Sequence, residues 1–219
     1  MFVGHYSASF LAKGLDRHLP LWLLFVAVQL IDILWAIFIL AGVEKVRIVP
    51  AFTRSNDIDL YFMPYTHSLP GAVGWSVLAF VLYYLLRRRD YSRRMIGAIL
   101  IGSAVLSHWV LDVLVHTPDL PLFDNSNKIG FGLWNYPEIE LPLELLLLFV
   151  GFWFYVRSTS AVSASGHYAM GIFVIVLAAL QLIMFFSPPP GSANIFAVTA
   201  FVSYAAFAAV AFWLERFRS

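Results

Sequence analysis

Residues 96–116 read IGAILIGSAVLSHWVLDVLVH, an apolar run long enough to cross a bilayer that carries His108, Asp112 and His116 near its end. These three residues are four positions apart, and four residues turn a helix by about 400°, so all three side chains share one stripe. An ionisable side chain inside a span costs about 2.5–3.5 kcal/mol and usually marks a functional interior. Because a carboxylate between two imidazoles can hold a divalent cation, this span indicates both the fold class and the chemistry.

The composition extends this interpretation to the whole chain. Its 219 residues are 61% apolar and only 12% charged, which is too apolar for a soluble domain. We therefore predict an all-α, polytopic membrane helical bundle that forms one domain, residues 1–219. Its six predicted spans are residues 21–40, 72–86, 96–115, 141–156, 167–186 and 195–214. The chain has no cysteine, which leaves His, Asp and Glu as strong metal ligands, and its net charge of +1 argues against a nucleic-acid partner.

The first twenty residues predict a short helix that does not cross the membrane. Residues 4–13 form a helical pattern too brief to span, and residues 14–20 form a turn before the first span, so we expect a re-entrant helical hairpin. His5 and Asp32 are each about 20 Å from the bend at 1.5 Å per residue, which places them at one level. No removable signal peptide is predicted.

The distribution of Lys and Arg predicts the orientation. With a cytoplasmic N-terminus, ten of the fourteen basic residues fall on the inner side, including the run Arg87-Arg88-Arg89, and four fall on the outer side. We therefore expect both termini in the cytoplasm. The two long loops, residues 43–65 and 117–137, then lie on the outer side.

Counting 1.5 Å per residue from the ends of each span places seven candidate ligands in the outer half of the membrane or at its outer edge. They are His5, Asp32, His67, His108, Asp112, His116 and Glu144. The last two spans contain no acidic residue, so residues 158–219 are predicted to be two packing helices around a core at residues 4–157. Each candidate also has a structural alternative. His108 and Asp112 could be a buried polar pair that joins helices, and Asp32 could pair with a neighbouring Trp, with a Tyr hydroxyl or with Gln29. His67 could start a helix at a wet interface, with Thr66 or Ser68 as the cap, and His116 could face water at a helix end.

Several of these residues occur in motifs that resemble a known family. Gly4-His5, Asp32 in QLID, Thr66-His67-Ser68 and the pattern Ser107-His108-x-x-Leu111-Asp112 are similar to the bacterial membrane-bound metal-dependent hydrolases. That group includes the LexA-binding inner-membrane-associated hydrolases and is distantly similar to zinc-dependent phospholipase C. The resemblance covers about residues 4–157 and implies a location in the bacterial cytoplasmic (inner) membrane.

The resemblance implies a zinc cluster held by His5, Asp32, His67, His108 and Asp112. His116 and Glu144 are expected to complete a further site, although position 140 is Glu where the phospholipase C pattern has His. One to three Zn²⁺ ions are expected, with Mn²⁺ or Fe²⁺ as alternatives.

The predicted chemistry follows from these ligands. Asp112 is placed to bridge two ions, and Asp32 could also accept a proton, so both are candidate catalytic residues. Arg47, Arg54 and Lys128 on the outer loops are candidates for binding an anionic head group.

Three functions remain open from the sequence. The first is a metal-dependent hydrolase acting on a phosphoester or other lipid-linked substrate in the membrane. The second is a divalent-cation or proton-coupled transporter, because buried His and Asp also line ion pathways. The third is a membrane scaffold that uses the polar residues only for packing.

Overall fold

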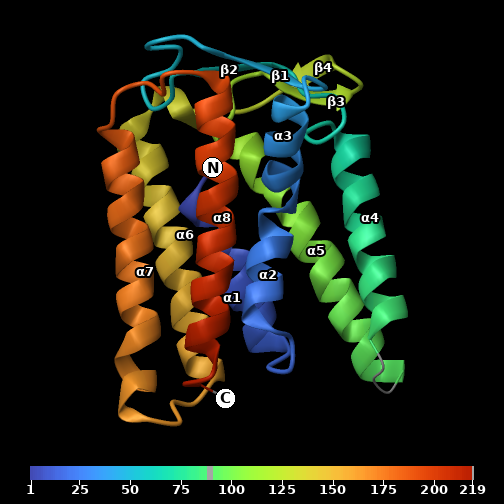
Figure 1. Cartoon of the computed structure of the whole chain (residues 1–219), viewed down its shortest axis with the longest axis vertical. Coiled ribbons are helices and arrows are strands. Elements are labelled where there is room, and N and C mark those ends of the chain that lie inside the picture. The colour runs from blue at the N-terminus through green and yellow to red at the C-terminus, as the bar shows by residue number, and fades with distance from the viewer. Residues whose placement is uncertain (88–90, 219) are drawn as a thin grey trace.

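The computed structural model describes residues 1–87 and 91–218 and is an all-α membrane bundle, which confirms the predicted fold class (Figure 1). Within this part of the chain, five helices are long and apolar enough to cross a membrane, and a sixth span results if α2 and α3 count as one. The helical elements are η1 Val3–His5, α1 Tyr6–Leu15, α2 Leu21–Val28, α3 Leu30–Leu40, α4 Leu69–Leu86, α5 Tyr91–Val115, η2 Leu133–Asn135, α6 Pro137–Ser158, α7 Ala164–Phe185 and α8 Ala193–Glu215. Arg88 and Arg89 of the basic run lie outside the described residues.

The predicted first span is broken into two helices. α2 and α3 meet at Gln29, and their axes are bent by 56°. Gln29 is fully buried, and its side-chain amide donates a hydrogen bond to the Phe2 carbonyl (3.4 Å). A break in a membrane helix is tolerated where protein covers the freed backbone groups, and here His108 of α5 lies 2.7 Å from the freed carbonyl of Val28.

The two long loops form β-hairpins, which the sequence did not predict. β1 (Lys45–Ile48) pairs antiparallel with β2 (Ile58–Phe62), and β3 (Leu120–Phe123) pairs antiparallel with β4 (Ser126–Ile129). Both hairpins cover the same end of the bundle, which we call the hairpin end (Figure 1). The connection between α7 and α8 reaches this end as well.

The N-terminal helix folds back against the bundle as the sequence predicted. α1 packs on α2 and α6, and its fully buried Tyr6 and Phe10 contact the ring of Phe25 on α2. Its far end is fixed by Lys13, whose ammonium donates to the carbonyls of Arg17 and Leu19 (both 2.7 Å) and pairs with Glu215 of α8. The turn before α2 is therefore held at the end of the bundle opposite the hairpins.

Gly151 allows α1 to approach α6 closely. A Cβ atom at this position would lie 2.6 Å from the Cα and 2.8 Å from the carbonyl oxygen of Ser7. Both atoms are backbone, so the helices would have to separate. We expect Gly151→Val to destabilise the folded protein by about 1–3 kcal/mol, the usual cost of overpacking. The measurement is the thermal unfolding midpoint in detergent.

Gly171→Val is the matched control for this prediction, because the nearest atom to an added Cβ there is a Phe152 ring carbon at an ordinary 3.7 Å. Equal midpoints for the two variants would contradict the close approach of α1 and α6.

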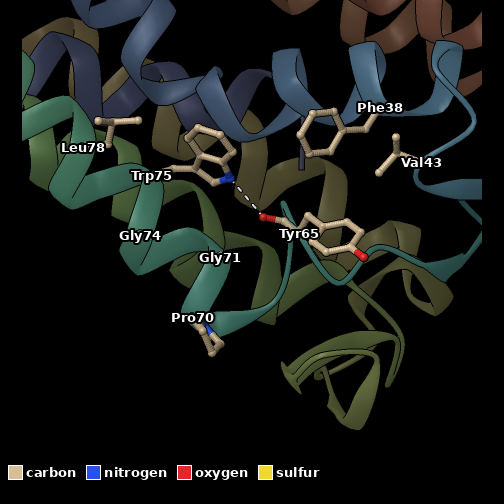
Figure 2. A pocket seen from close by; sticks show the side chains of 8 residues that line it. All are labelled: Phe38, Val43, Tyr65, Pro70, Gly71, Gly74, Trp75 and Leu78. Carbon is tan, nitrogen blue, oxygen red and sulfur yellow. Dashed lines mark hydrogen bonds between the residues drawn. The ribbon is translucent and has the colours of Figure 1, made fainter.

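A groove of about 460 Å³ lies where α3 meets α4 near the hairpin end (Figure 2). Its walls include Phe38, Tyr65, Trp75 and Leu78, and the Trp75 indole donates to the Tyr65 carbonyl (2.9 Å). The lining offers no His or carboxylate, so this groove has no metal ligand.

Candidate metal centre

Five buried or half-buried side chains converge in the bundle and form what we call the His/Asp cluster. They supply two groups whose ligand atoms lie within 4.8 Å of one another, His5 with His108 and Asp112, and Asp32 with His67 and His108. η1, α3, the segment before α4, and α5 each contribute. The structure therefore brings together five of the seven predicted ligands.

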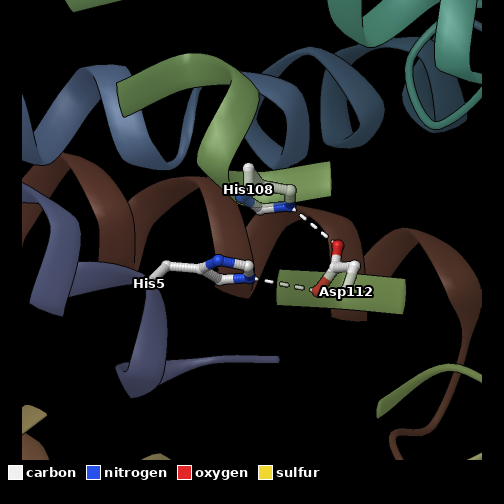
Figure 3. A group of neighbouring side chains, drawn as sticks. All are labelled: His5, His108 and Asp112. Atoms are coloured by element: carbon white, nitrogen blue, oxygen red, sulfur yellow. Dashed lines mark ion pairs between the residues drawn. The ribbon is translucent and has the colours of Figure 1, made fainter. Parts of the chain in front are cut away.

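Asp112 lies beside two imidazoles from different elements and pairs with the Nε2 atom of each (Figure 3). Its Oδ1 is 3.2 Å from His5 Nε2, and its Oδ2 is 3.1 Å from His108 Nε2. The two imidazole rings are stacked with centroids 3.8 Å apart. The Met1 amino group also donates to Oδ1 (2.7 Å). The two oxygens of this carboxylate thus face separate sets of partners, as a bridging ligand requires.

The second group has the spacing of ligands around a single ion. Asp32 Oδ1 is 3.3 Å from His67 Nε2 and 3.4 Å from His108 Nε2, and Asp112 Oδ2 is 3.9 Å from His67 Nε2. Two ligands of one tetrahedral zinc, each about 2.0–2.1 Å from the metal, lie roughly 3.3 Å apart. The separations of Asp32 Oδ1 from His67 Nε2 and from His108 Nε2 match this value.

The break at Gln29 orients His108. Because α2 ends at Val28, the carbonyl of Val28 has no partner in a continuing helix, and it lies 2.7 Å from His108 Nδ1. A carbonyl only accepts hydrogen bonds, so Nδ1 carries a proton, and in the neutral imidazole Nε2 then has the free lone pair. His108 Nε2 is buried, and it lies 3.1 Å from Asp112 Oδ2 and 3.4 Å from Asp32 Oδ1. The bent helix thus turns Nε2 toward Asp32 and Asp112.

His67 is oriented by a chain of polar groups that ends at Glu44. The Thr66 hydroxyl donates to Glu44 Oε2 (2.6 Å) and therefore accepts from His67 Nδ1 (2.8 Å). Glu44 also accepts the backbone N–H groups of Tyr65 and Thr66 (2.8 and 2.9 Å). The adjacent Ser68 caps α4, as the sequence suggested for it. His67 thus turns Nε2 toward the cluster, and such partners are usual for histidines that bind metals.

His116 lies beside the cluster, and like His67 it is oriented by a polar group at Nδ1. Its Nδ1 donates to Asp119 Oδ1 (2.8 Å), and its Nε2 is 3.7 Å from Asp112 Oδ2. The Trp134 ring packs against the imidazole with centroids 4.1 Å apart. His116 belongs to neither compact ligand group.

Glu144 is close to the cluster but has other partners. Its carboxylate accepts the backbone N–H groups of Phe2 (2.8 Å) and Gly4 (3.0 Å), so it holds the segment that carries His5. Glu140, one turn earlier on α6, is also buried, and its Oε2 has no hydrogen-bond partner. Neither residue belongs to the compact ligand groups.

The last helix contributes to the cluster, so its predicted role as a packing element is incomplete. The Tyr204 hydroxyl of α8 donates to Asp32 Oδ2 (2.8 Å), which leaves Oδ1 facing His67 and His108. A Tyr hydroxyl is one of the alternative partners that the sequence suggests for Asp32, but nothing in the sequence indicates that the Tyr is Tyr204.

We expect Tyr204→Phe to lower the zinc affinity about 10- to 100-fold, because groups that orient metal ligands usually contribute that much. Competition with a chromophoric zinc chelator measures this affinity. The matched control is Tyr83→Phe, since the buried Tyr83 hydroxyl has no hydrogen-bond partner among the residues that the structure describes. Unchanged zinc affinity in Tyr204→Phe would show that Asp32 does not depend on the tyrosine.

The three predicted head-group residues have partners on the hairpin end. Arg47 pairs with Asp59 across β1 and β2 (2.6 Å), and Arg54 pairs with Glu138 (3.1 Å). Lys128 donates to the Tyr61 carbonyl (2.8 Å), and burial lowers its pKa despite the acidic groups nearby. These three side chains do not line the cavity that reaches the cluster.

This cavity has a volume of about 370 Å³ and is called here the cluster cavity. At one end it is lined by Asp32, His67, Asp112 and His116, and at the other by the hairpin ends of α7 and α8. A small molecule in the cavity would therefore contact the candidate ligands directly.

No family model, curated protein or solved structure matches this chain. The resemblance to membrane-bound metal-dependent hydrolases therefore stays a prediction.

Proposed function

We propose that this protein is a membrane-embedded, metal-dependent hydrolase that cleaves a phosphoester or another lipid-linked substrate with a metal-activated water. The observation that carries the proposal is the orientation of the imidazoles. His67 and His108 each donate to an acceptor through Nδ1 and turn Nε2 toward the carboxylates. Asp32 Oδ1 lies 3.3 Å from His67 Nε2 and 3.4 Å from His108 Nε2, which is the separation of two ligands of one zinc ion.

The donor set supports zinc as the preferred metal. Imidazole nitrogens and carboxylate oxygens without sulfur suit Zn²⁺, and they also accept Mn²⁺ or Fe²⁺. Asp32, His67 and His108 form one compact ligand group, and Asp112 forms the other with His5 and His108. Asp112 Oδ2 lies 3.1 Å from His108 Nε2 and 3.9 Å from His67 Nε2, and Asp112 Oδ1 lies 3.2 Å from His5 Nε2. We therefore expect two ions, bridged by Asp112.

The residues of this chain would have distinct roles in hydrolysis. A bound zinc ion lowers the pKa of its water toward about 7 and supplies hydroxide near neutral pH. Asp32, held by Tyr204, is the candidate proton acceptor. His116, held by Asp119, faces the same cavity and could contact the leaving group.

We place the hairpin end on the outer side of a bacterial inner membrane, in agreement with the basic residues predicted to face the cytoplasm. The cluster cavity is lined by loops and helix ends of the hairpin end. A lipid head group can reach such a site from the membrane without leaving it, which favours a lipid-linked substrate.

The first test is elemental analysis of protein purified without chelator and then exposed to zinc, combined with hydrolysis of bis(p-nitrophenyl) phosphate. We expect about two zinc ions per chain and cleavage that EDTA abolishes and zinc restores. Protein that stays free of transition metal after zinc is supplied would contradict the proposal.

A flux measurement in the same preparation distinguishes transport from hydrolysis. Zinc uptake into proteoliposomes, without phosphodiester cleavage, would favour the transporter. We expect the opposite pattern, cleavage without uptake.

A further inference from the structure

The residues of α7 and α8 that line the cluster cavity change from polar to apolar with distance from the ligands. Beyond the ligands, the cavity is lined by Gln181 and Ser203, and then by Met184, Phe185, Phe196 and Ala200 at the hairpin ends of α7 and α8. Along α7 and α8 a polar region is therefore followed by an apolar one, while Ser55, Asn56 and Asp57 of the first hairpin form a separate polar part of the wall. A polar part next to the ligands and an apolar part farther away suit an amphipathic molecule whose head group lies at the cluster.

The apolar part of the cavity opens on membrane-spanning helices. Met184 is 50% exposed and Thr199 is also exposed, although both line the cavity. They belong to α7 and α8, both of which are long and apolar enough to cross a membrane. The opening between them therefore faces lipid near the hairpin end.

Gln181 supplies an unused acceptor between the two regions. Only 7% of the residue is exposed, and its side-chain Oε1 is buried without a hydrogen-bond partner. A buried amide oxygen without a partner costs about 1–3 kcal/mol, so a donor from a ligand would be bound favourably there. A hydroxyl or N–H group next to the phosphate of a lipid is such a donor.

We infer that the opening between α7 and α8 is the path by which the hydrocarbon chain of a lipid phosphoester enters, with the phosphate at the His/Asp cluster and the chain against Phe185, Phe196 and Ala200. This inference rests on the proposed function and adds the route and the substrate class. A cavity of about 370 Å³ holds roughly a dozen water-sized groups, which is enough for a phosphate and about eight carbons. The rest of the chain stays in the membrane.

The test measures binding of ethyl, butyl, octyl and dodecyl phosphate to zinc-loaded protein in lipid nanodiscs. We expect affinity to rise up to about fourfold per methylene, the value for full burial, and to stop rising near eight carbons. Ala200→Phe narrows the apolar part and is expected to reduce the ratio of octyl to ethyl affinity at least tenfold. Because partition into the disc lipid is the same for all variants, it cancels in this comparison.

Two further variants complete the design. Met184→Trp blocks the opening at a half-exposed position, where a substitution has little effect on folding, and should reduce the same ratio. Val198→Phe is the control, because Val198 is 47% exposed on α8 and does not line the cavity. It should leave the ratio unchanged.

The outcomes separate the two proposals. If ethyl phosphate binds but the octyl to ethyl ratio is the same in wild type, Ala200→Phe and Met184→Trp, the chain path is wrong and the hydrolase proposal stands. If ethyl phosphate does not bind to the zinc-loaded protein, the hydrolase proposal itself fails.

Discussion

Replacing Asp112 by Asn is expected to reduce the zinc affinity more than about 100-fold and to abolish phosphodiester cleavage. The substitution keeps the shape of the side chain but removes its negative charge. Asp112 faces His5 with one oxygen and His108 with the other, so both proposed ions lose a ligand at once. Loss of a ligand should exceed the 10- to 100-fold effect typical of groups that only orient ligands. Elemental analysis measures the zinc content, and chelator competition measures the zinc affinity.

Asp124→Asn is the control for this experiment. Asp124 lies in the turn of the second hairpin with φ 49°, a conformation that Asn adopts readily. It should bind zinc like wild type. If Asp112→Asn folds and keeps its full zinc content, Asp112 serves only to join helices and the metal proposal is wrong.

The sequence predicts the fold well because membrane spans depend on a simple physical requirement. About twenty apolar residues are needed to cross the hydrocarbon, and long apolar runs are easily recognised. α5 through α8 extend the predicted spans by a few residues at one end or both, where polar residues continue the helix into the interface. The bend at Gln29 is different, because a single polar residue in an apolar run does not reveal which backbone carbonyl another helix will use.

The grouping of ligands is predicted because depth in the membrane follows from residue count. His5, Asp32, His67, His108 and Asp112 were placed in one layer by arithmetic alone, and the structure brings them together. Lateral position does not follow from depth. His5 was expected to meet Asp32, whereas its ion-pair partner in the structure is Asp112.

The groups that orient the ligands are much harder to predict. Glu44 lies 23 positions before His67 in the chain, and Tyr204 lies 172 positions after Asp32, so only the tertiary fold brings them together. Asp119 is the exception, because it follows His116 by three residues and a local pairing was recognisable. Distant contacts of this kind depend on loop and helix packing that composition does not encode.

Replacing Glu144 by Leu is expected to detach the segment that carries His5. The buried N–H group of Gly4 and the half-buried N–H group of Phe2 would lose their acceptor, and each unsatisfied donor costs up to about 1–3 kcal/mol. The combined cost of up to about 2–6 kcal/mol is a large part of the 5–15 kcal/mol that typically stabilises a protein. We expect faster amide exchange in residues 2–6, a lower unfolding midpoint and loss of about one zinc ion.

Glu144→Gln distinguishes a structural role from the predicted role as a metal ligand. The amide keeps one carbonyl oxygen that can accept the N–H groups of Phe2 and Gly4, so this variant should keep slow exchange and most of its zinc. The carboxylate charge is lost in both variants, and a ligand role would make them lose zinc equally. Equal zinc loss in the Gln variant, with its N-terminal exchange still slow, would establish Glu144 as a ligand, whereas retention of zinc assigns it to holding His5 against Asp112.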